Sequence, residues 1–168
     1  MAEYDIINEV VVDAPPARVW AALIAELSGA GRWWVPANTF RIGALPPDAV
    51  GGETLVTVHT KGVGNGGPKL RFTSRTDVVE PERRLSGTYV DGVFRGTNEY
   101  LLEQLPDGRT LLAMHFRAAP HGVGKLLGKV ADIGGEHLKA TGAAFGRLAE
   151  VLATEKPAAE KPATVGAR

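Results

Sequence analysis

The apolar residues of this chain follow two kinds of spacing, one typical of strands and one typical of helices. Residues Tyr4 to Asp13 alternate between apolar and polar and are rich in Ile and Val, which predicts a β-strand. The spacing then becomes helical, which predicts a helix over Pro16 to Leu27 with Asp13 as its N-cap. Gly29 ends this helix, and Ala30 to Trp34 has room for a second short helical turn.

From Thr39 onward the alternating pattern returns. It predicts six further strands at Phe40–Gly43, Thr54–Lys61, Leu70–Val79, Arg84–Asp91, Gly96–Leu105 and Arg109–Ala118. Asp91-Gly92 and Asp107-Gly108 are typical of tight hairpin turns. Because all the connections are short, they favour an antiparallel meander.

The segment Gly122 to Thr154 is amphipathic and predicts one long helix, although each interior glycine costs roughly 1 kcal/mol relative to alanine. Its expected apolar arc consists of Leu127, Val130, Leu138, Phe145, Leu148 and Leu152. One edge of that arc carries a row of glycines, which we interpret as allowing a strand or the short helix to approach closely: Gly128, Gly135, Gly142 and Gly146.

A further glycine, Gly134, lies inside the arc together with His137 and Thr141. One interpretation is that Gly134 leaves space for a ligand and that His137 and Thr141 are polar groups of a cavity wall. The alternative is a core histidine bonded to a backbone carbonyl, with Thr141 bonding back within its own helix.

These elements predict an α+β fold in which a curved seven-stranded antiparallel sheet wraps around a long C-terminal helix, with one or two short helices after the first strand. We expect one domain over residues 1–154. Residues 155–168 repeat Glu-Lys-Pro-Ala and predict a disordered tail.

Composition narrows the possible functions. The 19 basic and 19 acidic residues cancel, so the strong basic field of a nucleic-acid-binding protein is missing. The chain has no cysteine, which excludes disulfides and thiol nucleophiles and fits a cytoplasmic location. It has no apolar run near the roughly 20 residues of a membrane span.

Three stretches of the sequence are similar to a known superfamily: VVVDAPPARVWAAL, WWVP and GTNEYLLEQLPDGRTLLAMHF, followed by the closing helix. Over roughly residues 4 to 152 the chain resembles the START and pollen-allergen superfamily (SRPBCC), and within it the bacterial polyketide cyclase/dehydrase and lipid-transport-like proteins. The resemblance implies a helix-grip fold with an apolar cavity between helix and sheet. Members bind lipids, sterols, polyketides or plant hormones, and some catalyse cyclisation, aromatisation or dehydration.

Alternation along the strands predicts which side chains line such a cavity. Residues on the solvent face, such as Arg71, Glu99 and His115, leave the opposite face to the cavity. The expected lining from the strands and the last helix is Phe72, Ser74, Thr76, Asn98, Tyr100, Leu102, Leu112, Met114, Phe116, Gly134, His137, Leu138 and Thr141. This mostly apolar set suits a small apolar molecule with one or two oxygens.

Trp33 and Trp34 also belong to the expected site. Because adjacent side chains point to different sides, we expect one of them in the core and the other at the cavity mouth, with packing for both as the alternative. The sequence does not decide which tryptophan faces the cavity.

Catalytic motifs are absent from the sequence. The three serines lie outside any Gly-x-Ser-x-Gly elbow, and the four histidines lack paired metal-ligand spacing, so we expect no metal and no cofactor. If a reaction occurs, His137, Tyr100 and His59 are the candidate acid–base groups.

Three functions remain open. The leading hypothesis is binding or carriage of a hydrophobic small molecule by a monomer or homodimer. The second is a polyketide cyclase, aromatase or dehydratase, for which a buried acid–base pair would be expected. The third is a protein-interaction or regulatory role, for which a filled core and a large exposed apolar patch would be expected.

Overall fold

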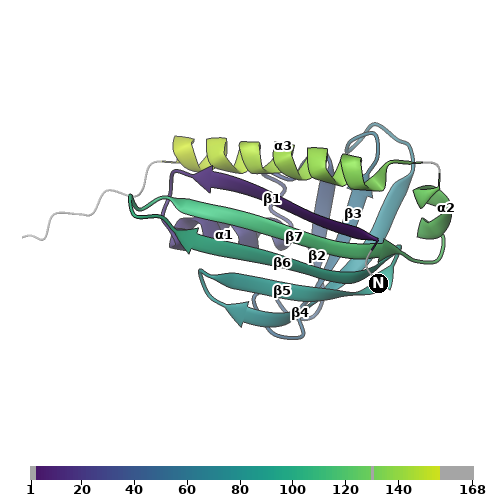
Figure 1. Ribbon diagram of the computed structural model, residues 1–168, viewed down its shortest axis with the longest axis horizontal. Helices are drawn as coiled ribbons and strands as arrows, with labels where there is room; N and C mark the ends of the chain where they lie inside the picture. The colour runs from purple at the N-terminus through teal and green to yellow at the C-terminus, as the bar shows by residue number, and fades with distance from the viewer. Residues whose placement is uncertain (1–2, 130, 156–168) are drawn as a thin grey trace, which may run out of the picture.

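Seven β-strands form one antiparallel sheet in the computed structural model, which describes residues 3–129 and 131–155. The strands are β1 (Tyr4–Val12), β2 (Asn38–Ile42), β3 (Glu53–His59), β4 (Lys69–Glu80), β5 (Arg84–Gly92), β6 (Phe94–Gln104) and β7 (Thr110–Pro120). Their order in the sheet is β1-β7-β6-β5-β4-β3-β2. The described residues also form the helices α1 (Pro16–Leu27), α2 (Gly124–Gly128) and α3 (Ile133–Thr154). The predicted seven-stranded sheet and a long helix at its C-terminal side are therefore confirmed, although that helix begins later than predicted (Figure 1).

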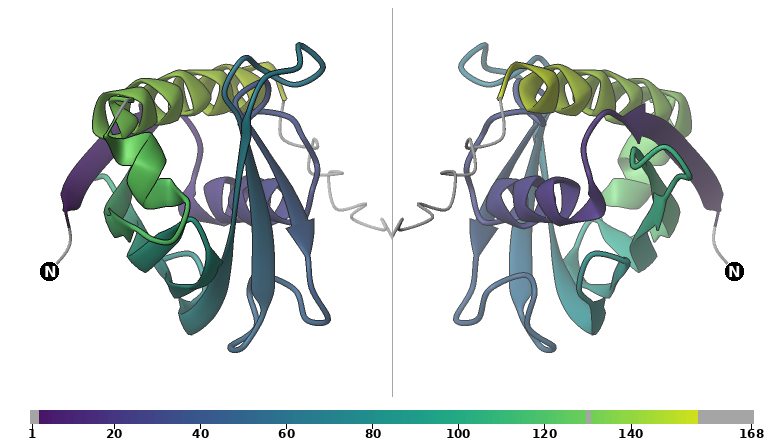
Figure 2. Two further views of the ribbon diagram at one scale, coloured as in Figure 1. Left: turned by 90° about the vertical axis from the view of Figure 1, so that its right-hand side faces the viewer. Right: turned by 90° about the vertical axis from the view of Figure 1, so that its left-hand side faces the viewer.

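The sheet is strongly curled. The pairing of β4 with β5 shifts register after Thr73 and again after Thr76, and such bulges bend a strand and increase its twist. Gly96 has a φ of 135°, and a Cβ there would lie 2.1 Å from the carbonyl oxygen of Arg117, so β6 can approach β7 this closely only with glycine. Figure 2 shows the result: α3 lies across the open side of the curve, and α1 lies within the curve at one end.

The C-terminal helical segment differs from its prediction. Instead of one helix over Gly122 to Thr154, the chain forms α2, a break, and then α3. The break has a local cause: the Asp132 carboxylate accepts a hydrogen bond from the backbone N–H of Gly135 at 2.9 Å and caps a new helix. Val130 of the expected arc lies outside the described residues.

Two smaller predictions near α1 are wrong. The N-cap of α1 is Pro15, without a side-chain hydrogen bond, so Asp13 does not cap the helix. Residues Ala30 to Trp34 form an irregular segment with bends at Arg32 to Trp34 and no second helix. The reason is a set of backbone hydrogen bonds to the Glu26 side chain, which hold this loop in an irregular path.

The hydrophobic core consists of two clusters at opposite ends of the sheet. The first packs α1 and the C-terminal half of α3 against the sheet, around Leu23, Trp33 and Phe145. The second lies around Phe94 and Phe116, which meet edge to face with ring centroids 5.6 Å apart. Splitting the core in this way leaves the middle of the sheet free to face a cavity.

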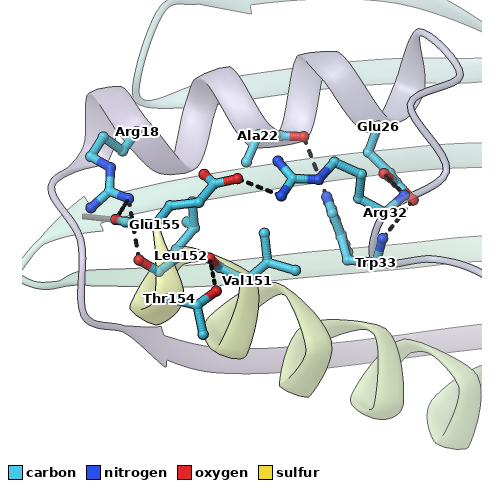
Figure 3. A network of polar contacts seen from close by, with 9 residues as sticks. All are labelled: Arg18, Ala22, Glu26, Arg32, Trp33, Val151, Leu152, Thr154 and Glu155. Atoms are coloured by element: carbon cyan, nitrogen blue, oxygen red, sulfur yellow. Dashed lines mark hydrogen bonds and ion pairs between the residues drawn. The ribbon is translucent and has the colours of Figure 1, made fainter. Parts of the chain in front are cut away.

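Polar contacts join the end of α3 to α1 (Figure 3). The Arg18 guanidinium donates to the carbonyl oxygens of Leu152 and Glu155, at 3.2 and 2.6 Å. The Glu155 carboxylate pairs with Arg32 in the loop after α1. These contacts hold α3 at its C-terminal end, close to the first core cluster. Glu155 is also the one residue of the expected tail, 155–168, that the structure describes.

Candidate functional site

A cavity of about 530 Å³ lies between the two core clusters, bounded by the concave face of the sheet, α3 and the Trp34 loop. Its wall includes nine of the residues that alternation and helical spacing predict as lining: Trp34, Phe72, Ser74, Thr76, Asn98, Tyr100, Met114, Phe116 and His137. His59, the third candidate acid–base residue, also borders it. The curled sheet therefore brings together side chains from six strands, and α3 adds His137.

Six expected lining residues lie elsewhere: Trp33, Leu102, Leu112, Gly134, Leu138 and Thr141. Leu102 and Leu112 face inward as predicted, but they are buried in the first core cluster, at the end that α1 covers. Thr141 is fully buried between helix and sheet, whereas Leu138 is 49% exposed. The Leu138 prediction was wrong because Leu138 lies at the edge of the buried face of α3, beyond Phe145, where the sheet no longer covers it.

Gly134 does not create space for a ligand. A Cβ at this position would lie 3.2 Å from the Tyr4 ring, so Gly134 lets α3 pack against β1. The close-packing role expected of the edge row of glycines is limited to Gly128, where a Cβ would lie 3.4 Å from Pro120. A Cβ would have no neighbour within 4 Å at Gly146 and only Asn8 Nδ2, at 3.9 Å, at Gly142. At Gly135 it would strike the Asp132 carboxylate, which makes this glycine part of the helix cap.

His137 is a cavity residue whose pKa is strongly lowered by burial. Its ring stacks on Phe116 with centroids 4.1 Å apart, and its Nε2 lies 3.3 Å from the Thr141 hydroxyl. Burial among these groups lowers the pKa of His137 from 6.5 to about 4, because a charged imidazolium would lose its hydration. The imidazole is therefore neutral near pH 7. The expected carbonyl partner is replaced by Thr141, which bonds the ring instead of its own backbone.

The floor of the cavity carries a hydroxyl cluster made of Ser74, Tyr89 and Tyr100, with Asn98 beside it. Asn98 Nδ2 donates to Ser74 Oγ at 2.7 Å. Burial raises the pKa of both phenols well above 10, so both are protonated at any physiological pH. The Asn98 side chain near Tyr89 and the Trp34 indole N–H near Tyr100 each partly oppose this rise in the pKa of the neighbouring phenol.

The two tryptophans face different sides, with Trp33 in the core and Trp34 on the cavity wall, but the expected position at the cavity mouth is not found. Trp33 packs on Phe145, and its indole N–H donates to the carbonyl of Ala22 at 3.3 Å. Both side chains are only 1% exposed, so neither lies open at the mouth.

A buried carboxylate fixes the tryptophan loop. Glu26 is fully buried in α1 and accepts hydrogen bonds from the backbone N–H groups of Arg32, Trp33 and Trp34, at 2.8, 3.0 and 2.7 Å. Three charge-assisted bonds satisfy the carboxylate and hold Trp34 against the cavity. Sequence reasoning missed Glu26, although it shares the buried helix face of Leu23 and Leu27.

Charged groups gather where the β3–β4 loop meets the start of α3. Lys61, Gly62 and Asn65 from the loop border the cavity, as do Asp132 and Glu136. Figure 2 shows this loop rising beside α3.

His59, from the end of β3, borders the cavity beside this loop, with its Nε2 2.9 Å from Thr39 Oγ1. Partial burial, then the nearby Lys69 and Arg71, lower the pKa of His59.

Several lining residues were missed, including Tyr89, Phe94, Val56 and Ala140. The alternation within β5 contains the signal for Tyr89, since Leu85, Gly87 and Tyr89 share the inward face. Among the described ranges, no group of three His, Cys, Asp or Glu side chains is placed to hold a metal ion. No helix of residues 3–129 and 131–155 is long and apolar enough to cross a membrane.

A curled antiparallel sheet that grips a C-terminal helix around a cavity defines the helix-grip class of proteins. The model of the family described as "Polyketide cyclase / dehydrase and lipid transport" matches residues 5–153. The chain therefore belongs to this family, within the SRPBCC superfamily. No curated protein matches it.

Solved structures share the fold at low sequence identity. A Rhodobacter sphaeroides protein is 20% identical with a TM-score of 0.65, covering 90% of this chain and 93% of that one. The Zhui aromatase/cyclase from Streptomyces sp. R1128 is 17% identical with a TM-score of 0.60, covering 86% and 93%. Ara h 8.0201 is 15% identical with a TM-score of 0.61, covering 90% and 99%.

Proposed function

We propose that this protein binds a hydrophobic small molecule, such as a lipid or polyketide, in the cavity between α3 and the sheet. The observation that carries the proposal is the cavity itself. Its volume of about 530 Å³ lies within the range of roughly 300–1,000 Å³ typical of small-molecule sites. Aromatic and aliphatic side chains form most of the wall, and a few polar groups lie among them, which is the composition that such ligands require.

A pair of alanines on α3 provides the test. Ala140 borders the cavity, and Ala143, almost one helical turn further along, is exposed. Ala140→Phe is expected to fill cavity space and weaken binding of an apolar fluorescent dye at least tenfold, while Ala143→Phe binds like the parent. Circular dichroism checks that both variants are folded. Equal dye binding by the two variants, or no dye binding by the parent, would contradict the proposal.

A cyclase or dehydratase activity is the second candidate, and the neutral His137 favours it. An unprotonated imidazole in a dry cavity can accept a proton from a carbon beside a carbonyl, and a buried phenol such as Tyr100 can donate one to oxygen. The family description and the similarity to an aromatase/cyclase support this chemistry. It would be tested by incubating a short poly-β-ketone thioester with the protein and with His137→Phe. A cyclised product that forms at equal rates with both, or with neither, argues against catalysis.

A protein-interaction role was expected to come with a filled core. The cavity separates the two core clusters, so the packing gives no support to that third hypothesis.

A further inference from the structure

The hydroxyl cluster of Ser74, Tyr89 and Tyr100 adds hydrogen-bonding groups to a cavity wall that is otherwise mostly apolar. All three side chains border the cavity. Tyr89 and Tyr100 are each only 4% exposed, and the rise in the pKa of each phenol shows how completely the surrounding protein removes it from water. A buried hydroxyl group that lacks a hydrogen-bond partner costs free energy, so such groups normally have one. The three hydroxyl groups are therefore expected to have hydrogen-bond partners, either in the protein or in a ligand.

The oxygen atoms of the cluster face N–H donors from the protein. Asn98 Nδ2 donates to Ser74 Oγ at 2.7 Å, and the Asn98 side chain also lies close to the Tyr89 phenol. The Trp34 indole N–H lies near the Tyr100 phenol, yet it is buried and reaches no acceptor with good geometry among the described residues. The Glu26 carboxylate also lies near Tyr100, but its oxygens already accept three backbone N–H groups.

The hydroxyl protons of the cluster are left without an acceptor from the protein. Within residues 3–129 and 131–155, the side-chain hydrogen bond that these three hydroxyls form with the protein is the one that Ser74 Oγ accepts from Asn98, and none of them donates. A hydroxyl whose oxygen already faces an N–H group needs an acceptor for its proton. In a cavity, that acceptor has to come from whatever occupies the space.

We propose that Ser74, Tyr89 and Tyr100 donate hydrogen bonds to a carbonyl oxygen of the ligand, so that the cavity selects apolar molecules carrying a ketone or quinone over the corresponding hydrocarbons. This proposal rests on the proposed binding function and names its ligand class. A carbonyl oxygen fits because it accepts through two lone pairs and has no proton of its own. A ligand alcohol would bring a further donor into a region that already has too many.

The ligand pair fluorenone and fluorene tests this directly, because the two molecules have nearly the same shape and differ in one carbonyl oxygen. We expect the parent protein to bind fluorenone about fivefold or more tightly than fluorene, the effect of one to two hydrogen bonds. Tyr89→Phe and Tyr100→Phe are each expected to weaken fluorenone binding about fivefold and to leave fluorene binding unchanged. Ser74→Ala is expected to act in the same direction. Affinities would be measured by calorimetry.

Tyr4→Phe is the matched control, because Tyr4 packs on Phe116 outside the cavity wall and is expected to leave both affinities unchanged. Equal binding of the two ligands by the parent, or equal weakening of both ligands by the Tyr→Phe variants, would overturn the carbonyl proposal and leave the binding function standing. If neither ligand binds and the apolar dye also fails to bind, the binding function itself fails. Thermal unfolding of each variant separates loss of affinity from loss of fold.

Discussion

The neutral state of His137 predicts how the stability of the protein depends on pH. Burial lowers the pKa of this imidazole from 6.5 to about 4. Between these two pH values the unfolded chain binds a proton at His137, whereas the folded protein does not. Asp132 and Glu136 also border the cavity, but burial alone accounts for the direction of the shift. Because the folded pKa is depressed, His137 leaves stability unaffected above pH 6.5 and reduces it progressively as the pH falls toward 4.

The size of the effect follows from the two pKa values. At about pH 5 the unfolded histidine is almost fully protonated and the folded one is almost fully neutral, which corresponds to a loss of about 2 kcal/mol relative to about pH 7.5. His137→Phe removes the titrating group and keeps an aromatic ring stacked on Phe116. The variant is therefore expected to lose about 2 kcal/mol less than the parent over this interval.

Urea unfolding at the two pH values measures this difference. His121→Phe is the matched control, because His121 is exposed, and this variant should keep the pH dependence of the parent. The pKa of Asp5 is lowered by its hydrogen bond to His115. This carboxylate is present in all three proteins, so its contribution to the pH dependence of stability cancels when the variants are compared with the parent. If the parent and His137→Phe lose the same free energy, burial does not hold His137 neutral.

Two further sites give predictions about stability. Glu26→Ala leaves the three backbone N–H groups of the Trp33–Trp34 loop without their acceptor and is expected to cost about 3 kcal/mol or more in urea unfolding; a cost near zero would show that water replaces the carboxylate. Gly146→Ala places its methyl group in open space and is expected to raise stability by about 1 kcal/mol, whereas Gly134→Ala meets Tyr4 at 3.2 Å and should gain clearly less. Equal thermal shifts for the two glycine variants would mean that α3 does not need Gly134 in order to approach β1.

The sheet could be predicted because alternation is a local signal. Phe72, Tyr100 and Met114 each follow the two-residue period of their own strand, and each borders the cavity as expected. What alternation cannot tell is the position along the strand at which the cavity ends. Leu102 and Leu112 share the inward face but lie under α1, where the first core cluster fills the space. That boundary depends on contacts between distant segments.

The C-terminal helix was harder to predict because its starting residue and the width of its buried face depend on tertiary contacts. Once Asp132 starts a new helix, Ile133, His137 and Ala140 share the face toward the cavity. Leu138 falls on the exposed side, although its hydrophobicity favours burial. The roles of the glycines could not be predicted from the sequence. Gly134 and Gly146 both lie within α3, but only Gly134 has a side chain, Tyr4, packed against it.

The residues around the cavity indicate why the core is divided. Ala140 borders it from α3, and Ser74 and Gly87 border it from the sheet, so small side chains come together where the two core clusters leave a space. Gly87 cannot be enlarged in place, because a Cβ there would lie 2.7 Å from the backbone carbonyl oxygen of Arg75. Ala140 has no such restriction, and interiors without a ligand are normally close-packed. If the cavity serves binding, Ala140→Phe should therefore abolish ligand binding and at the same time maintain or raise stability, which is the trade-off expected when a core is left open for a function.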